Sequence, residues 1–176
     1  GRAGFRRRWN PGGHVAGVGE GGGRTVGRQG GITSPGTGIG SDTHADLALV
    51  RTRNPLVGYV FALDASQPEV GTDVAAIGYP MAGPESLTKG SISGLERTID
   101  LGNGPMSGLI QTDTPINHGN SGGPLLSTRE TVVGLVDAMD TGANGIGYAI
   151  PAPSACTQLQ AWIQTPAHAP AGNRQK

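Results

Sequence analysis

The chain has 176 residues, including 32 glycines and 13 prolines, and its 13 basic and 13 acidic side chains balance. This length suffices for one sizeable domain or two small, closely packed halves. No run approaches the roughly 18 apolar residues of a membrane span, and no signal-peptide pattern is present. The single cysteine, Cys156, excludes an internal disulfide framework and argues against a structural zinc site, so we expect no metal or cofactor.

Residues 1–41 form a Gly/Arg-rich segment that differs from the rest of the chain. The first forty residues hold fifteen glycines and six arginines but one acidic side chain, whereas the remainder holds seven basic and twelve acidic ones. A basic end on an acidic body is typical of nucleic-acid binding. The segment has only two aromatic residues and no helical period, so we expect no nucleic-acid partner.

The body of the chain, residues 42–165, consists of short apolar runs separated by turn signals, and residues 166–176 are expected to form a flexible tail. Only residues 154–164 are typical of a helix, with Ser154 as the N-cap and Leu159, Trp162 and Ile163 as its apolar face. Many short strands and one terminal helix predict an all-β sandwich or barrel. The expected strands are 47–50, 57–63, 74–79, 86–95, 109–113, 131–138 and 146–150.

The motif Asn117-His-Gly-Asn-Ser-Gly-Gly-Pro-Leu-Leu126 is the most informative part of the sequence. Gly119 and Gly122 permit backbone conformations closed to residues with a Cβ, so consecutive N–H groups can point to one spot beside the Ser121 hydroxyl. Acyl transfer needs this pairing of a nucleophile with oxyanion donors. The alternative is a glycine-rich turn with an incidental serine.

A serine nucleophile needs a base, and the chain offers four histidines. His168 lies in the Pro/Ala-rich tail, His118 is too close to Ser121 in the same loop, and His44 would share the strand entry of Asp46. His14 therefore remains as the candidate base.

The candidate acid is Asp46, which opens the first clear buried strand, Asp46-Leu-Ala-Leu-Val50. An aspartate beside an apolar run needs a partner if it is shielded from water. Its alternative role is a strand-end cap or turn residue. The order His14, Asp46, Ser121 is one of the chain orders known for a catalytic triad.

Five motifs together resemble the trypsin-like serine peptidases of the bacterial HtrA (Deg) type, most closely over residues 42–164. They are His14-Val15, Asp46-Leu-Ala-Leu-Val, Ile77-Gly-Tyr-Pro, the long run from Ile110 through Ser121 to Leu125, and Gly147-Tyr-Ala-Ile-Pro151. The resemblance implies two perpendicular six-stranded β-barrels with a short C-terminal helix and a site in the cleft between them. It also implies polypeptide substrates, a homo-oligomer such as a trimer, and an extracytoplasmic location.

The resemblance further implies a serine endopeptidase that works through an acyl-enzyme. His14 would be the general base, Asp46 would fix its tautomer, Ser121 would be the nucleophile, and the N–H groups of Gly119 and Ser121 would bind the oxyanion. The specificity pocket would be framed by Ile116, the strand Asp137-Ala138-Met139, and Tyr148. Unless Asp137 points inward, this frame favours small or medium aliphatic side chains.

The chain departs from the family pattern before and after this body. Pro11-Gly12-Gly13 replaces the usual Thr-Asn and small residue before the histidine, and glycine, arginine and proline replace the expected strands between histidine and aspartate. The sequence ends shortly after the expected terminal helix, so we expect no PDZ domain, a module common in HtrA proteins, within residues 1–176. Residues before 41 also resemble an out-of-frame reading of a GC-rich gene, in which case the first barrel is incomplete and the position of His14 is a coincidence.

Two other functions fit parts of the sequence. A catalytically impaired trypsin-like fold, lacking a working base, would serve as a peptide-binding or scaffold module. The motif around Ser121 also fits Gly-x-Ser-x-Gly, the nucleophile elbow of α/β-hydrolases. That fold needs a helix, an acid and a histidine after the serine, whereas Pro124 and a strand pattern follow here and the only later histidine is His168.

Overall fold

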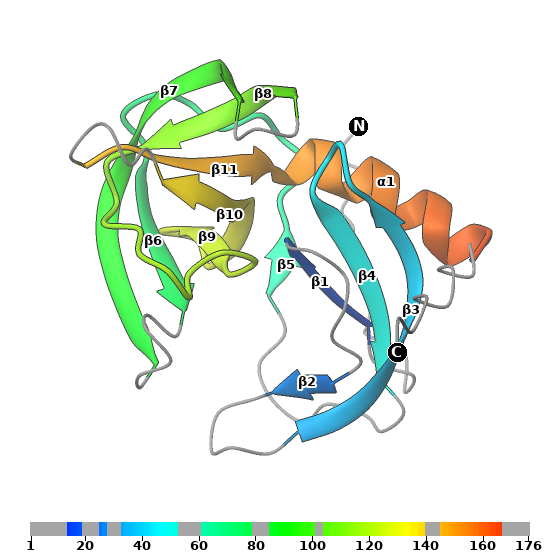
Figure 1. Ribbon diagram of the computed structural model, residues 1–176. Coiled ribbons are helices and arrows are strands. Elements are labelled where there is room, and N and C mark those ends of the chain that lie inside the picture. Colours follow the sequence, from blue (N-terminus) through cyan, green and yellow to red (C-terminus); the bar gives the residue numbers. More distant parts are fainter. Residues whose placement is uncertain are drawn as a thin grey trace.

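The computed structural model describes the backbone of residues 14–18, 25–27, 33–52, 61–78, 85–100, 104–139 and 145–166. Within these ranges the side chains are described from residue 35 onward, except at positions 138 and 139. The described strands gather in two lobes, β1 to β4 in one and β6 to β11 in the other (Figure 1). The helix α1 lies beside β3 and β4 and also packs against β10 and β11.

The first lobe is a four-stranded antiparallel sheet in the order β1-β4-β3-β2. Alternating burial explains β4, because Leu47 and Leu49 face the core while Ala48 and Val50 are half-buried. β3 includes residues on both sides of the boundary that the sequence predicts between the Gly/Arg-rich segment (residues 1–41) and the body of the chain (residues 42–165). The strands are β1 (His14–Val18), β2 (Thr25–Gly27), β3 (Thr33–Asp42) and β4 (Leu47–Thr52).

The second lobe is a sheet in the order β11-β8-β7-β6-β9-β10-β5, and an additional pairing of β10 with β11 closes six of its strands into a ring. The short β5 adds to this ring parallel to β10. The strands are β5 (Ala62–Leu63), β6 (Asp73–Gly78), β7 (Ser86–Asp100), β8 (Pro105–Thr112), β9 (Pro124–Ser127), β10 (Thr131–Met139) and β11 (Gly147–Pro151).

The all-β class with a C-terminal helix, as predicted from the sequence, is confirmed. Strands also form at or near most of the expected positions, although β7 and β8 extend further than predicted and β9 was not predicted as a separate strand. Of the strand expected at 57–63, residues 57–60 lie outside the described residues, and Ala62–Leu63 is a strand.

The helix α1 (Ala152–Gln164) corrects two details of the sequence prediction. Its N-cap is Pro151, without a side-chain cap hydrogen bond, so Ser154 lies inside the first turn rather than capping it. A proline in the first turn is tolerated there because its missing N–H has no helical partner. Ile163 is 46% exposed, and the buried face instead consists of Ala152, Ala155, Leu159 and Trp162.

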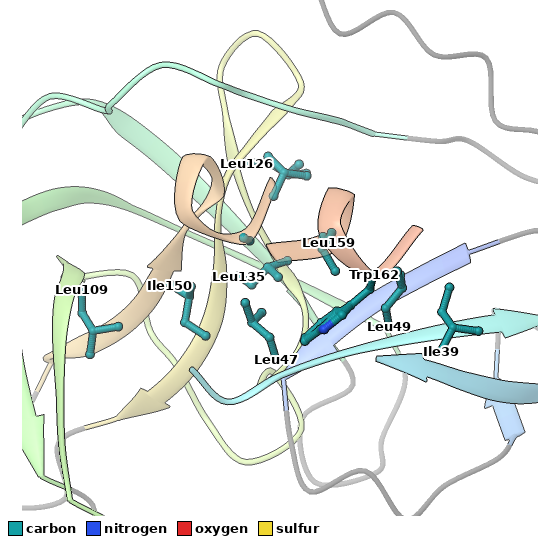
Figure 2. Close-up of a cluster of buried hydrophobic side chains, with 11 residues drawn as sticks. Ile39, Leu47, Leu49, Leu109, Leu126, Leu135, Ile150, Leu159 and Trp162 are labelled. Carbon is teal, nitrogen blue, oxygen red and sulfur yellow. The ribbon is translucent and has the colours of Figure 1, made fainter. Parts of the chain in front are cut away.

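Two hydrophobic clusters fill the molecule. One lies within the ring and includes Ile92, Ile110, Leu125 and Val136. The other cluster joins the first sheet, the ring of strands and the helix. Figure 2 shows the indole of Trp162 beside Leu47 and Leu49. The two lobes therefore share one continuous apolar contact, which fixes how the loops at their junction face each other. Its members are Ile39, Leu47, Leu49, Leu109, Leu126, Val132, Leu135, Ile150, Ala155, Leu159 and Trp162.

Candidate active site

The chain enters the Ser121 loop through a segment that is pinned to β7. The hydroxyl of Thr112 donates to Ser91 O at 2.7 Å, and the N–H of Thr114 donates to Thr112 Oγ1 at 3.1 Å. The carboxylate of Asp113 accepts from the N–H of Ser91 at 2.5 Å. Because both threonines are fully buried, the start of the loop is held as firmly as the core.

The loop itself turns at two glycines with positive φ. Gly119 has φ 102° and Gly122 has φ 81°, values that side chains with a Cβ resist. The N–H of Asn120 donates to Asn117 O at 3.0 Å and closes the first turn. Two further bonds tie the loop to β10, from Gly122 N–H to Val136 O at 2.7 Å and from Val136 N–H to Gly123 O at 2.9 Å.

Ser121 stands exposed at the tip of this tightly held loop. The loop N–H groups of Asn120, Gly122 and Gly123 are used in backbone hydrogen bonds, whereas those of Gly119 and Ser121 have no backbone partner among the described residues. An exposed hydroxyl beside unused N–H donors is an arrangement that can attack a carbonyl and bind the resulting oxyanion.

Asn120 is the buried residue of the Ser121 loop and packs against β6. The sequence did not identify it as a candidate site residue. Asn120 is 2% exposed, and a Cβ on Gly78 at the end of β6 would collide with it. Its Oδ1 has no hydrogen-bond partner among the described residues. Gly78 is therefore the residue that lets the loop pack directly on β6.

Asp46 ends the turn between β3 and β4, in the first lobe. The carboxylate of Asp42 accepts from the N–H groups of His44 at 2.9 Å and Ala45 at 3.1 Å, which fixes the start of this turn. Asp46 has φ 47° and is half-buried. Aspartate is one of the few residues with a side chain that enters this left-handed region readily.

The structure brings Asp46 into contact with Asp137 on β10. Asp137 is 7% exposed, and its carboxyl lies within hydrogen-bonding reach of the carboxyl of Asp46. Burial, the hydrogen bond and the charge of Asp46 raise the pKa of Asp137 to about 7. Sequence analysis missed this contact, although a carboxyl that follows the buried run Val132–Val136 signals a need for a partner.

His14 begins β1, and its side chain lies outside the described ones. Its backbone pairs with Arg51, whereas Val18 pairs with Leu47, the residue after Asp46. In this register His14 lies four residues along β4 from Leu47, or about 14 Å at the rise of a strand. The structure thus joins β1 to the strand that follows Asp46 but does not bring His14 to the Asp46 end of it.

The residues expected to frame a specificity pocket lie around the junction of β10 and β11. Ala138 pairs with Tyr148, and Met139 pairs with Gly147. A Cβ on Gly147 would collide with Ile116, so Ile116, at the start of the Ser121 loop, packs on β11. Ile116 is therefore the member of this set that the structure places beside β11, whereas the Asp137 carboxyl lies beside Asp46.

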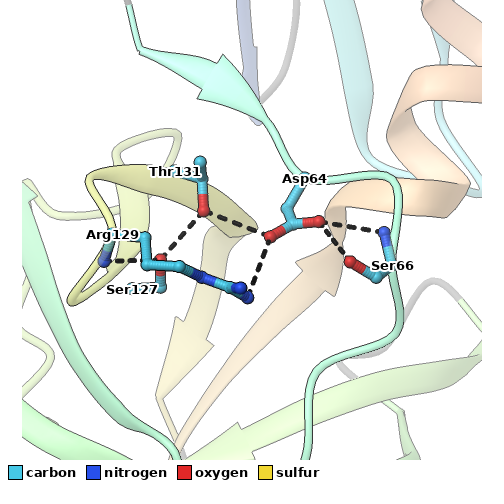
Figure 3. Close-up of polar contacts among 5 residues, drawn as sticks. All are labelled: Asp64, Ser66, Ser127, Arg129 and Thr131. Atoms are coloured by element: carbon cyan, nitrogen blue, oxygen red, sulfur yellow. Dashed lines mark hydrogen bonds and ion pairs between the residues drawn. The ribbon is translucent and has the colours of Figure 1, made fainter. Parts of the chain in front are cut away.

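A second polar cluster lies near β5 (Figure 3). The carboxylate of Asp64 accepts from Ser66 N–H at 3.0 Å and from Thr131 Oγ1 at 3.2 Å, and Arg129 lies 3.8 Å away. Hydrogen bonds from Ser66 are the main cause that lowers the pKa of Asp64 below its ordinary value. This cluster ties the end of β5 to the β9–β10 hairpin and contains no described residue of the serine loop.

Among the side chains that the structure describes, no group of three or more His, Cys, Asp and Glu residues could hold a metal ion. Within the same part of the chain, no helix is long and apolar enough to cross a bilayer.

Known proteins resemble this chain in sequence and in fold. The family description "Trypsin-like peptidase domain" matches residues 12–135. "Serine protease Do-like HtrB" of Bacillus subtilis is 41% identical over 122 residues, which cover 64% of this chain and 26% of the relative. "Periplasmic pH-dependent serine endoprotease DegQ" of Escherichia coli is 36% identical over 129 residues, covering 71% and 28%.

The solved structure "HtrA-type protease AlgW with decapeptide" superposes with a TM-score of 0.78 at 28% identity, covering 89% of this chain and 50% of that one. The chain spans about a quarter of the length of the two curated relatives. Both the sequence match and the superposition extend over the two lobes. The chain therefore belongs to the family of trypsin-like peptidase domains and is of the HtrA type within it.

Proposed function

We propose that this domain is a serine endopeptidase in which Ser121 is the nucleophile. The observation that carries the proposal is the Ser121 loop: an exposed hydroxyl, two glycines with positive φ, and two N–H groups without a backbone partner among the described residues. Membership of the trypsin-like family supports the same function. Removal of one oxyanion donor typically costs about 10²–10³ in rate, so the conformation of this loop is part of the catalyst.

In the proposed reaction, His14 takes the proton from Ser121 Oγ as the oxygen attacks the peptide carbonyl. The N–H groups of Gly119 and Ser121 stabilise the oxyanion, and Asp46 holds the imidazole in the required tautomer. His14 then gives its proton to the leaving amine, and an acyl-enzyme remains. A water molecule, deprotonated by the same histidine, hydrolyses the ester and restores Ser121.

The role of His14 rests on its order in the chain and on the family match, which begins two residues before it. An imidazole must come within about 3 Å of both the acid and the nucleophile. For His14 to be the base, β1 must therefore lie about four residues further along β4 than its pairing with Arg51 places it. A domain that keeps this register would instead be the impaired peptide-binding module.

Polypeptides are the proposed substrates, with small or medium aliphatic side chains at the cleaved position. The proximity of Ile116 to β11 supports an apolar pocket there, framed by Ala138, Met139 and Tyr148. The name of the DegQ relative supports an extracytoplasmic location. The homo-oligomer implied by the family resemblance stays a prediction, to be measured by light scattering.

Hydrolysis of fluorescently labelled casein tests the proposed function. Wild type is expected to cleave it, and Ser121→Ala should lower kcat by about 10³-fold or more because the nucleophile is lost. Ser154→Ala, an exposed serine on α1 that makes no cap hydrogen bond, is the matched control and should behave as wild type. A folded wild type without activity, or an active Ser121→Ala variant, would contradict the proposal.

A further inference from the structure

The contact between Asp46 and Asp137 joins the two lobes at the candidate site. Asp46 belongs to the β3–β4 turn of the first lobe, and Asp137 belongs to β10 of the ring. The residue before Asp137 is Val136, whose N–H and C=O are both bonded to the Ser121 loop. β10 thus contacts the Ser121 loop through Val136 and the candidate acid Asp46 through the next residue, Asp137.

This contact needs a proton. Asp137 Oδ2 is buried and receives no N–H or O–H donor from the described residues, and the partner of the side chain is another carboxyl. Ionised carboxylates only accept hydrogen bonds, so two of them can bond to each other only if one is protonated. A carboxylate that is 7% exposed and lacks a donor is also costly to ionise.

We propose that Asp137 is a positioning residue, which holds a proton and donates it in a hydrogen bond to the carboxylate of Asp46. This inference rests on the proposed function, because it assigns the orientation of the candidate acid to a second carboxyl. The protonated Asp137 satisfies one oxygen of Asp46 and leaves the other to accept from the base. It differs from the substrate-binding role expected for Asp137 from the sequence.

Asp46 is the one charged group that affects the pKa of Asp137 among the described residues. The other described titratable side chains near these two residues do not contribute to the shift of the Asp137 pKa. They are Asp42 and His44 in the β3–β4 segment, Asp64 beyond β5, His118 in the Ser121 loop, Arg129 and Glu130 in the β9–β10 turn, Tyr148 on β11 and Cys156 on α1. β1, which carries His14, also packs against β10.

The shared proton makes the site sensitive to alkaline pH. Since the pKa of Asp137 is raised to about 7, the proton is present at acidic pH, is lost from about half of the molecules at neutral pH, and is absent at alkaline pH. The two adjacent carboxylates, one buried and one half-buried, then repel each other, and Asp46 loses its orientation. We therefore expect an alkaline decline of kcat, in addition to the acidic decline caused by protonation of the histidine base.

The test compares the pH profile of casein hydrolysis by wild type, Asp137→Asn and Asp73→Asn. The amide introduced by Asp137→Asn can donate to Asp46 at every pH, so the alkaline limb, roughly tenfold per pH unit in wild type, should disappear while the acidic limb remains. Asp73 is an exposed aspartate on β6, so its variant should keep both limbs. Asp137→Ala should lower kcat at all pH values, with little change in KM.

An Asp137→Asn variant that keeps the wild-type alkaline limb would overturn the proposal. A second readout does not need activity: the Tm of wild type minus that of Asp137→Asn, measured from pH 4 to 9. Between the ordinary carboxyl pKa of about 4 and the folded value of about 7, native wild type binds the extra proton, so its relative stability should fall as pH rises and level off above 7.

The two readouts separate the two failures. If wild type cleaves nothing, the proposed function fails and the positioning role fails with it, whereas a falling Tm difference still establishes the shared proton. If wild type is active and the Tm difference does not change with pH, the shared proton is absent, and this inference alone is overturned.

Discussion

Gly119 shows how much of the proposed chemistry depends on one backbone angle. Its φ of 102° places the turn before Ser121 in a conformation that a Cβ penalises. Gly71, at φ 87° in an open turn before β6, has the same kind of angle with no atom within 4 Å of a Cβ built on it. A side chain introduced at either glycine would therefore strain the backbone in the same way. Gly119, however, lies close to the proposed nucleophile in the sequence, and Gly71 lies far from it.

We predict that Gly119→Ala lowers kcat/KM by about 10²-fold, because the loop relaxes and an oxyanion donor turns away. The matched control, Gly71→Ala, should keep full activity, and both variants should lose about 1 kcal/mol of unfolding free energy. Casein hydrolysis and urea denaturation measure the two effects. Equal activity in the two variants would contradict the proposed role of the Gly119 N–H as an oxyanion donor.

At the scale of elements, α1 holds the two lobes together. Trp162 is 7% exposed, and a Cβ on Gly40 of β3 would collide with its indole ring. The helix also packs against β10 and β11 of the ring. Because Asp46 and Ser121 come from different lobes, the helix contributes to their relative placement without touching either.

We predict that Trp162→Ala lowers the free energy of unfolding by about 3–5 kcal/mol, the usual cost of removing a buried aromatic side chain. Ile163→Ala, at the neighbouring 46%-exposed position, should cost about 0.5 kcal/mol. Urea denaturation followed by circular dichroism measures both. Similar losses in the two variants would show that the helix does not pack through Trp162.

The elements that the sequence predicts well are those whose pattern reflects local burial. β4, β6, β10 and β11 carry apolar runs or alternation, so their strands could be predicted. β3 could not, because glycines at positions 36, 38 and 40 give it little strand preference. It is a strand because β2 and β4 pair with it and because Trp162 packs on Gly40.

The candidate site divides in the same way. Ser121 and Asp46 stand in local motifs, so each could be proposed from the sequence. The contact of Asp46 with Asp137 joins segments about ninety residues apart, and the pairing of His14 with Arg51 depends on strand register. Register follows from pairing across the whole sheet, which no local pattern near His14 specifies.

At the scale of the whole molecule, the proposed site is an assembly of two lobes. The ring supplies Ser121 and the oxyanion donors, and the first sheet supplies Asp46 and His14. Shared core packing, the helix and the Asp46–Asp137 bond hold these parts together. In the proposed mechanism, activity therefore requires that both lobes are docked and that β1 carries His14 to their junction.

Labelling with a fluorophosphonate, followed by mass spectrometry of the modified peptide, tests this assembly most directly. The probe reacts only with a serine that a base has activated. Wild type should be labelled at Ser121, His14→Ala should be labelled about 10³-fold more slowly, and His44→Ala, an exposed histidine in the β3–β4 turn, should match wild type. A folded wild type that stays unlabelled, or His14→Ala labelled at the wild-type rate, would contradict the proposed triad.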